Sequence, residues 1–114
     1  MFDVAKASEE IVTAWPVIID VPKSGGKSTR HKAHVDFQVF DQDKLDEMQL
    51  LGDDIQFLKK VIVGWHDKDF GQAGIPMEFN EENLEKVLKI AYVRMAMLRE
   101  YQNVVGFGGK RKNL

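Results

Sequence analysis

The sequence predicts an α+β fold, in which an N-terminal antiparallel β-hairpin or small sheet is followed by three to four packed helices. Two observations predict this class. Apolar and polar residues alternate through the first third of the chain, as they do in strands with one buried face. Beyond residue 40, apolar residues recur every three or four positions, as they do along one side of a helix. At 114 residues, the chain is expected to form a single domain.

The hairpin is predicted over residues 13–40, after an N-terminal arm at residues 1–12 that is either a short helix or a loose segment. The adjacent glycines Gly25 and Gly26 supply the positive φ that a tight turn between two strands needs. Each strand places an apolar row on one face, and a hairpin alone is only marginally stable. The row expected to face the core comprises Val17, Ile19, Val35 and Phe37.

Residues 41–105 are predicted to form the helical part that covers this apolar row. Asp41 can cap a first short helix, because its carboxylate can accept hydrogen bonds from the free amides of the first turn. Gly52-Asp53-Asp54 then interrupts the chain and caps a second helix, which is expected to end near Gly64.

The second half of the helical part contains a loop and the longest predicted helix. Residues 66–74 are rich in charge and glycine, and residues 75–79 are expected to be extended. Asn80 caps a helix that is predicted to continue to about Val105. The remaining residues, 106–114, are predicted to form a flexible basic tail.

The last predicted helix carries more apolar surface than a monomer needs, since one stripe of about 100° is enough for a surface helix. At 100° per residue, one stripe holds Leu84, Leu88, Ala91, Met95 and Leu98, and a second holds Ile90, Val93, Met97, Tyr101 and Val104. Either the helix is enclosed by the fold, or one stripe faces another chain. We expect the first stripe to pack on the hairpin and the second to bind a partner.

The predicted partner-binding residues are therefore Ile90, Val93, Met97, Tyr101 and Trp65. Methionine suits such a surface, because its flexible thioether repacks easily against different partners. Tryptophan is a common centre of binding energy at interfaces. Its size also suits Trp65 to anchoring a loop on the core, and this alternative remains open.

Composition and charge exclude several classes of function. The chain has no cysteine, which excludes disulfides and thiolate chemistry and suits a reducing cytosol. Its net charge of −2 and pI near 5.9 argue against nucleic acid as a partner. The first residues lack the pattern of a secretory signal, and no apolar run approaches the ~20 residues that cross a bilayer, so we expect no membrane association.

One segment is similar to a nucleotide-binding motif but is interpreted as a turn. Gly26-Lys27-Ser28-Thr29 has the ending of a phosphate-binding loop. The full motif needs another glycine where Val21 stands, and it must open a helix whose amides hold the phosphate. A strand is predicted to follow here, so we expect no nucleotide site.

The histidines and carboxylates show no spacing that is typical of a metal or catalytic site. His31 and His34 are predicted to point to opposite faces of a strand, whereas a metal needs at least three converging ligands. The loop His66-Asp67-Lys68-Asp69 lacks the ligand spacing of an EF-hand and a nucleophile at a fixed offset. We therefore expect no metal, no cofactor and no enzymatic activity. A metal-dependent hydrolase using His66 and Asp67 is the remaining enzymatic alternative.

Short motifs follow one another along nearly the whole chain in the order found in a known family. They are Phe2-Asp3, Trp15-Pro16-Val17, Pro22-Lys23-Ser24-Gly25-Gly26, Val61-Ile62-Val63-Gly64-Trp65, Gly74-Ile75-Pro76-Met77-Glu78-Phe79, Glu82-Asn83-Leu84, Tyr101, Gly106 to Gly109 and Lys112-Asn113. In these motifs the chain resembles the tail-assembly chaperones of long-tailed bacteriophages and prophages. It departs from them at Ala91-Tyr92, where the family often breaks its last helix with a proline-like turn.

The resemblance implies a protein that binds the tape-measure protein and keeps it soluble while the tail tube assembles. It also implies a location in the cytoplasm of the bacterial host and absence from the mature virion. The tail tube protein is a second expected partner, and self-association is expected as well. The family has no catalytic residues to carry over. The alternative is a structural minor tail protein that is retained in the virion.

Overall fold

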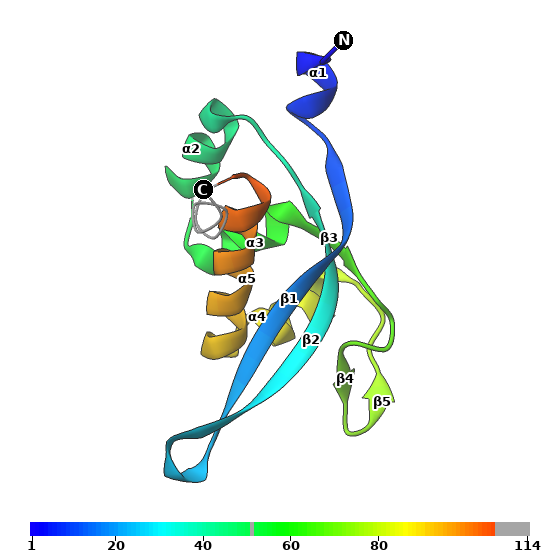
Figure 1. Cartoon of the computed structure of the whole chain (residues 1–114), viewed down its shortest axis with the longest axis vertical. Coiled ribbons are helices and arrows are strands. Elements are labelled where there is room, and N and C mark those ends of the chain that lie inside the picture. The colour runs from blue at the N-terminus through cyan, green and yellow to red at the C-terminus, as the bar shows by residue number, and fades with distance from the viewer. Residues whose placement is uncertain (51, 107–114) are drawn as a thin grey trace.

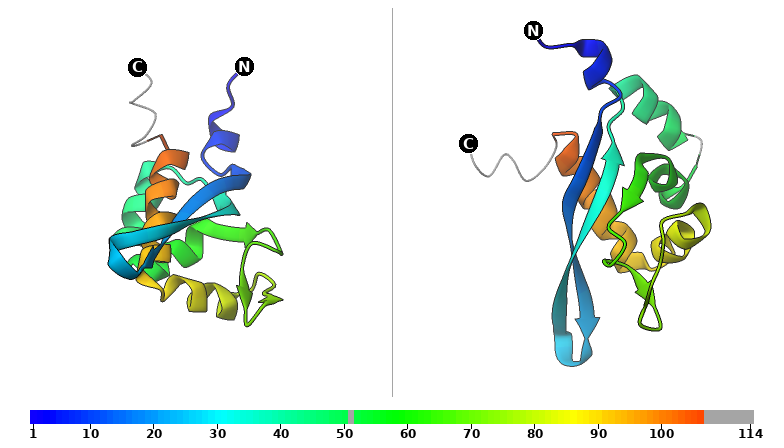
Figure 2. Two further views of the ribbon diagram at one scale, coloured as in Figure 1. Left: turned by 60° about the horizontal axis from the view of Figure 1, so that its bottom comes forward. Right: turned by 90° about the vertical axis from the view of Figure 1, so that its right-hand side faces the viewer.

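The structure is a computed structural model that describes residues 1–50 and 52–106. A three-stranded antiparallel sheet in the order β1-β2-β3 packs against helices that gather on one of its faces (Figures 1 and 2). Its strands are β1 (Ile11–Lys23), β2 (Lys27–Gln38) and β3 (Ile62–Trp65). The helices are α1 (Val4–Ala7), α2 (Gln42–Leu50), α3 (Asp54–Val61), α4 (Glu81–Leu88) and α5 (Ala91–Val104). The predicted α+β class is confirmed.

The hairpin of β1 and β2 lies two residues earlier than the predicted range 13–40, because β1 begins at Ile11 and β2 ends at Gln38. Its turn, η1 (Ser24–Gly26), uses Gly25 at φ 77° and Gly26 at φ 76°, as the paired glycines predict. The tip of the hairpin projects beyond the helices (Figure 1). The predicted apolar row is buried, which confirms it as the sheet side of the core; it comprises Val17, Ile19, Val35 and Phe37.

The middle of the chain corrects one prediction, because the second helix does not reach Gly64. Helix α3 ends at Val61, and the next four residues form β3, which pairs with β2 so that Trp65 lies opposite Val35. Gly64 suits this close pairing, since a Cβ there would lie 2.6 Å from a carboxylate oxygen of Asp36. The 41–105 segment therefore contains strands as well as helices.

The segment after β3 forms a separate, small two-stranded hairpin. Its strands are β4 (Gly71–Gln72) and β5 (Ile75–Pro76). The predicted extended segment at 75–79 is thus paired only at its start. Asn80 then caps α4 by accepting a hydrogen bond from the Asn83 amide at 2.8 Å, as predicted.

The long C-terminal helix predicted after Asn80 is two helices. Lys89 and Ile90 separate α4 from α5, and Ile90 has an extended backbone with φ −83° and ψ 112°. The Arg94 guanidinium donates a hydrogen bond to the Leu88 carbonyl at 2.9 Å, and so satisfies one acceptor that the break leaves free. The break directly precedes Ala91-Tyr92, where the sequence departs from the pattern of the tail-assembly chaperones.

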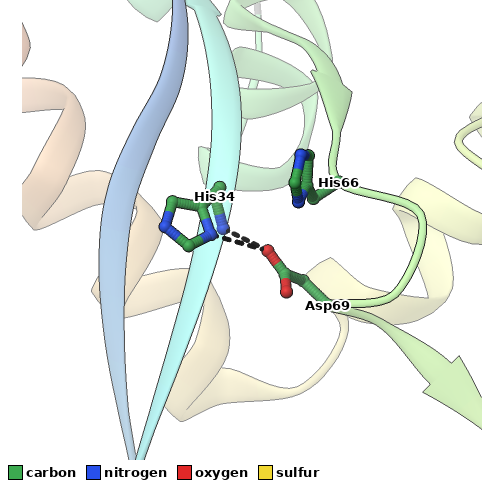
Figure 3. A group of neighbouring side chains, drawn as sticks. All are labelled: His34, His66 and Asp69. Carbon is green, nitrogen blue, oxygen red and sulfur yellow. Dashed lines mark hydrogen bonds and ion pairs between the residues drawn. The ribbon is translucent and has the colours of Figure 1, made fainter.

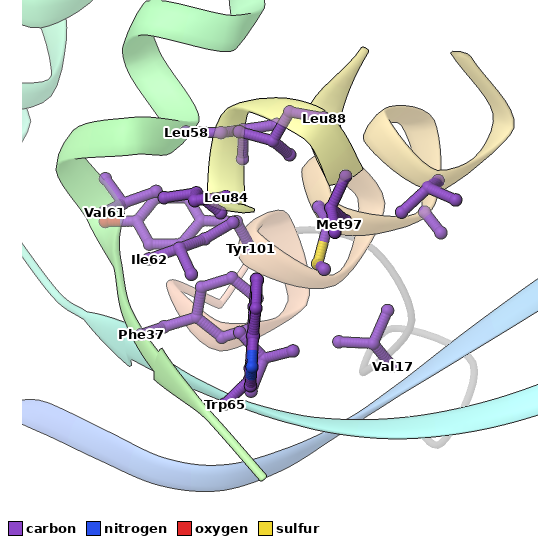
Figure 4. Close-up of a cluster of buried hydrophobic side chains, with 14 of the residues drawn as sticks. Val17, Phe37, Leu58, Val61, Ile62, Trp65, Leu84, Leu88, Met97 and Tyr101 are labelled. Carbon is purple, nitrogen blue, oxygen red and sulfur yellow. The ribbon is translucent and has the colours of Figure 1, made fainter. Parts of the chain in front are cut away.

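The core lies between the sheet and α2–α5, and it draws side chains from every one of these elements (Figure 4). Its most enclosed large side chains are Phe37, Leu58, Ile62, Leu88 and Met97. Among the described residues, no helix is long and apolar enough to cross a membrane. The predicted basic tail at 106–114 lies outside the described residues from residue 107 onward.

Candidate functional site

The predicted partner-binding stripe of α5 lies mostly inside the fold, which corrects the sequence analysis. Met97 has an exposed fraction of 0%, and Val93 and Tyr101 are also buried. Ile90 alone keeps a substantial exposed surface. In the first stripe Leu84 and Leu88 are buried as predicted, but Met95 is exposed although it was expected to pack on the hairpin and middle helices.

The break at Ile90 explains this exchange of faces. A continuous helix turns by 100° per residue, and any break changes the rotation between the residues on its two sides. Only the first stripe ran across the break, so it joined residues that do not share a face, whereas the second lies on α5 from its N-cap Ile90 onward. Taken separately, each helix has one buried stripe. In α4 it comprises Leu84, Val87 and Leu88, and in α5 it comprises Val93, Ala96, Met97 and Tyr101.

Tyr101 fixes the C-terminal half of α5 to the sheet. Its ring lies between those of Phe37 and Phe57, at centroid distances of 5.7 and 5.6 Å. Its hydroxyl donates a hydrogen bond to the Gln38 carbonyl at 2.9 Å. Burial raises the pKa of Tyr101 to about 12, because the phenolate would lose its hydration. Tyr101 is a structural residue.

Trp65 also takes the structural role that the sequence analysis left open. Its indole contacts the rings of Phe70 and Phe79, at centroid distances of 4.6 and 5.1 Å. Its Nε1–H donates a hydrogen bond to the Met77 carbonyl at 3.0 Å. Trp65 is buried, so it anchors the loop and small hairpin that follow β3 to the core (Figure 4).

The exposed apolar surface of this part of the fold surrounds the start of α5. It comprises Ile90, Tyr92 and Met95, which we call the α5 patch. Met95 is 64% exposed and projects from the side of α5 opposite to its buried stripe. Covering Met95 with a partner would remove apolar surface from water and so stabilise the complex. Met97 offers no such gain, because it is already buried.

A shallow hollow of about 270 Å³ adjoins this patch on the side of the small hairpin. It lies between β4, α4 and Ile90, the residue that precedes α5. Its lining comprises Gly71, Gln72, Met77, Lys86, Val87 and Ile90. Ile75, which pairs with Gln72 across the small hairpin, is exposed beside it.

Ion pairs hold α4 against α3 on the far side of this region. The ammonium of Lys59 lies 3.1 Å from Glu85 and 3.2 Å from Glu81. The hydrogen bond from Lys59 lowers the pKa of Glu85, and the same contact raises the pKa of Lys59. These groups stabilise the helix pair that ends at the α5 patch, and the arrangement contains no nucleophile.

A group of ligand-type side chains forms where β2, β3 and the following loop meet (Figure 3). One ring nitrogen of His34, one ring nitrogen of His66 and one carboxylate oxygen of Asp69 lie within 4.8 Å of one another. The sequence analysis considered the two histidines separately and paired His66 with Asp67. It missed the group because it did not predict β3, and β3 is the strand that brings His66 beside His34.

Comparison with known proteins adds no relative to these observations. No family model, no curated protein and no solved structure matches the chain. The resemblance to tail-assembly chaperones therefore rests on the order of short sequence motifs, and the candidate binding surface rests on the exposure of the α5 patch.

Proposed function

We propose that this chain is a tail-assembly chaperone of a long-tailed bacteriophage or prophage. In this role it binds the tape-measure protein and keeps it soluble while the tail tube polymerises. It acts without catalysis, in the cytoplasm of the bacterial host, and it is absent from the mature virion. The order of motifs from Phe2-Asp3 to Gly106 is the observation that carries this proposal.

The α5 patch is the surface that we assign to the client. A long helical client exposes apolar seams before it is assembled, and such seams aggregate unless another apolar surface covers them. Ile90, Tyr92 and Met95 offer that surface on one short stretch of backbone. Met95 adds adaptability, because an unbranched thioether fits client seams of different shape.

A pair of methionines two residues apart allows a direct test. Met95→Asp places a charge on the exposed patch, where it should change stability by less than ~0.5 kcal/mol. Binding would desolvate this charge without a partner, so the soluble fraction of a co-expressed tape-measure protein should fall. Met97→Asp should instead unfold the domain, because it buries an unpaired charge. Thermal melts by circular dichroism and client solubility are measured together.

Val4→Asp is the matched control, since Val4 is 72% exposed on α1 and lies outside the α5 patch. It should leave both the melt and client solubility unchanged. If Met95→Asp and Val4→Asp affect the client equally, the α5 patch is not the binding surface. Mass spectrometry of purified virions tests the role itself: a stoichiometric amount of the chain in the particle would favour the structural tail protein.

A further inference from the structure

The strongest unassigned feature is the group formed by His34, His66 and Asp69 on the face of the sheet away from the helices. Along β2, Ala33 and Val35 are buried in the core, so His34 between them points to the outer face. The His66 amide donates to the His34 carbonyl at 3.0 Å, one residue beyond the pairing of Trp65 with Val35. The two histidines are therefore cross-strand neighbours.

A tight turn then returns Asp69 to the same place. The Asp69 amide donates to the His66 carbonyl at 3.0 Å, which closes the turn. The Asp69 carboxylate accepts hydrogen bonds from the backbone amide of His34 at 2.7 Å and from its ring Nδ1 at 3.0 Å (Figure 3). Backbone hydrogen bonds thus fix the relative positions of all three residues.

We propose that His34, His66 and Asp69 form a binding site for one divalent transition-metal ion of the Zn²⁺ class. Two imidazoles and one carboxylate are ligands that such ions prefer. In a tetrahedral zinc site, neighbouring ligand atoms lie about 3.3 Å apart. On binding, the ion would replace the proton that His34 Nδ1 donates to the Asp69 carboxylate. The 3.0 Å between these two atoms, and the 4.8 Å limit for the whole group, come within small side-chain rotations of that geometry.

The surroundings of the group leave room for a fourth ligand. His66 is exposed, and His34 keeps about a third of its side-chain surface, at 35%. A hollow lined by Trp65, His66, Asp67 and Lys68 opens beside the group, so water can complete the coordination. The bound ion would tie the loop after β3 to the outer face of β2. It would thereby fix the small hairpin that borders the hollow beside the α5 patch.

The test is titration of chelator-treated, tag-free protein with Zn²⁺ alone, followed by calorimetry and by thermal melting. The chain should bind one ion, and saturating Zn²⁺ should raise the melting temperature, because the site exists only in the folded state. His66→Ala removes an exposed ligand without disturbing the core. Asp69→Asn removes a charged ligand but keeps an oxygen that accepts from the His34 amide. Each variant should weaken binding at least about tenfold.

His31→Ala is the matched control, because His31 lies on β2 but on the opposite face from His34. It should leave the affinity and the shift in melting temperature unchanged within about twofold. With Co²⁺ as the probe, wild type and His31→Ala should show the visible absorption of a tetrahedral site, and His66→Ala should not. Absence of saturable binding, or equal weakening by His31→Ala and His66→Ala, would overturn the proposal. Neither result bears on the chaperone role.

Discussion

At the scale of the residue, small differences of position decide which side chains are structural. Met95 and Met97 have the same chemistry, but one is exposed and the other is enclosed by the core. Burial of Tyr101 and Trp65 follows the same logic, because each large ring has a backbone carbonyl that accepts its only polar hydrogen. The helical projection predicted a binding role for Tyr101, and both a binding and a core role were open for Trp65. Burial and satisfied hydrogen bonds mark both as parts of the core.

Phe37 provides the clearest test of the core at this scale. Its side chain is fully buried between the sheet and the helices, so Phe37→Ala should lower the free energy of unfolding by about 3–5 kcal/mol. Phe2→Ala is the control, because Phe2 is 80% exposed and its loss should have little effect. Both values come from urea denaturation followed by circular dichroism. A loss below ~1 kcal/mol for Phe37→Ala would mean that this face of the hairpin is not in the core.

At the scale of the element, local signals were predicted well and remote pairings were not. Asp41 and Asn80 cap α2 and α4 through hydrogen bonds within three residues, and such contacts can be inferred from the sequence alone. Strand β3 depends on β2, which lies about 25 residues earlier in the chain, and four residues are too few to show a period. The same omission concealed the group at His34, since only β3 brings its members together.

The break between α4 and α5 had the largest consequence for the candidate site. No glycine or proline marks it, and the apolar pattern continues through Ile90. The contacts that define the break are tertiary, and one example is the Arg94 hydrogen bond to the Leu88 carbonyl. A helical projection that crosses such a break assigns residues to the wrong faces. The helical projection therefore overestimated the apolar surface that α5 exposes.

Glu85 tests the contact between α3 and α4 through its dependence on pH. Lys59 lowers the pKa of Glu85, so this pair stabilises the fold above the ordinary carboxyl pKa and loses its effect as pH falls through the lowered value. Glu85→Gln should thus lower stability at pH 7, and the difference from wild type should shrink as pH falls through the lowered pKa of Glu85. Urea denaturation across this pH range measures it.

Glu82→Gln is the matched control for this contact, because Glu82 is highly exposed and, within the described part of the chain, forms an ion pair only with Lys86, at 3.8 Å. Its effect at pH 7 should be smaller than that of Glu85→Gln. A loss in Glu85→Gln that persists unchanged at low pH would show that packing, and not the ion pair with Lys59, is responsible.

At the scale of the whole molecule, the hairpin must extend past the helices without pairing with other chains. The backbone amide and carbonyl of His34 point away from β1, toward Asp69 and His66. Pro16 lies opposite His34 in the antiparallel pair, so its backbone nitrogen and carbonyl point away from β2, toward the open edge of β1. Alternation places Ile18 and Pro22 in the same orientation, and the Ile18 carbonyl accepts a hydrogen bond from Arg99 at 3.0 Å.

This open edge therefore has few groups that another strand could use. Both prolines lack the amide hydrogen that would otherwise point outward, and Arg99 occupies one of the carbonyls. The distal part of the hairpin adds four basic side chains and one acidic one, and like charges oppose stacking of two such ribbons. These charged residues are Asp20, Lys23, Lys27, Arg30 and Lys32. The edge is therefore suited to remaining unpaired.

Backbone amides that point outward at positions 16 and 22 should allow this edge to pair with strands of other chains. The double variant Pro16→Val with Pro22→Val gives β1 two additional donors on its open side and keeps residues that favour strands. It should form larger species than wild type at the same concentration, as measured by size-exclusion chromatography with light scattering. Pro76→Val is the control, because β5 is only two residues long and offers no comparable edge.

If the double variant and wild type keep the same size distribution over a hundredfold range of concentration, the prolines do not protect the edge. Arg99 and the charged side chains would then be sufficient to keep β1 unpaired.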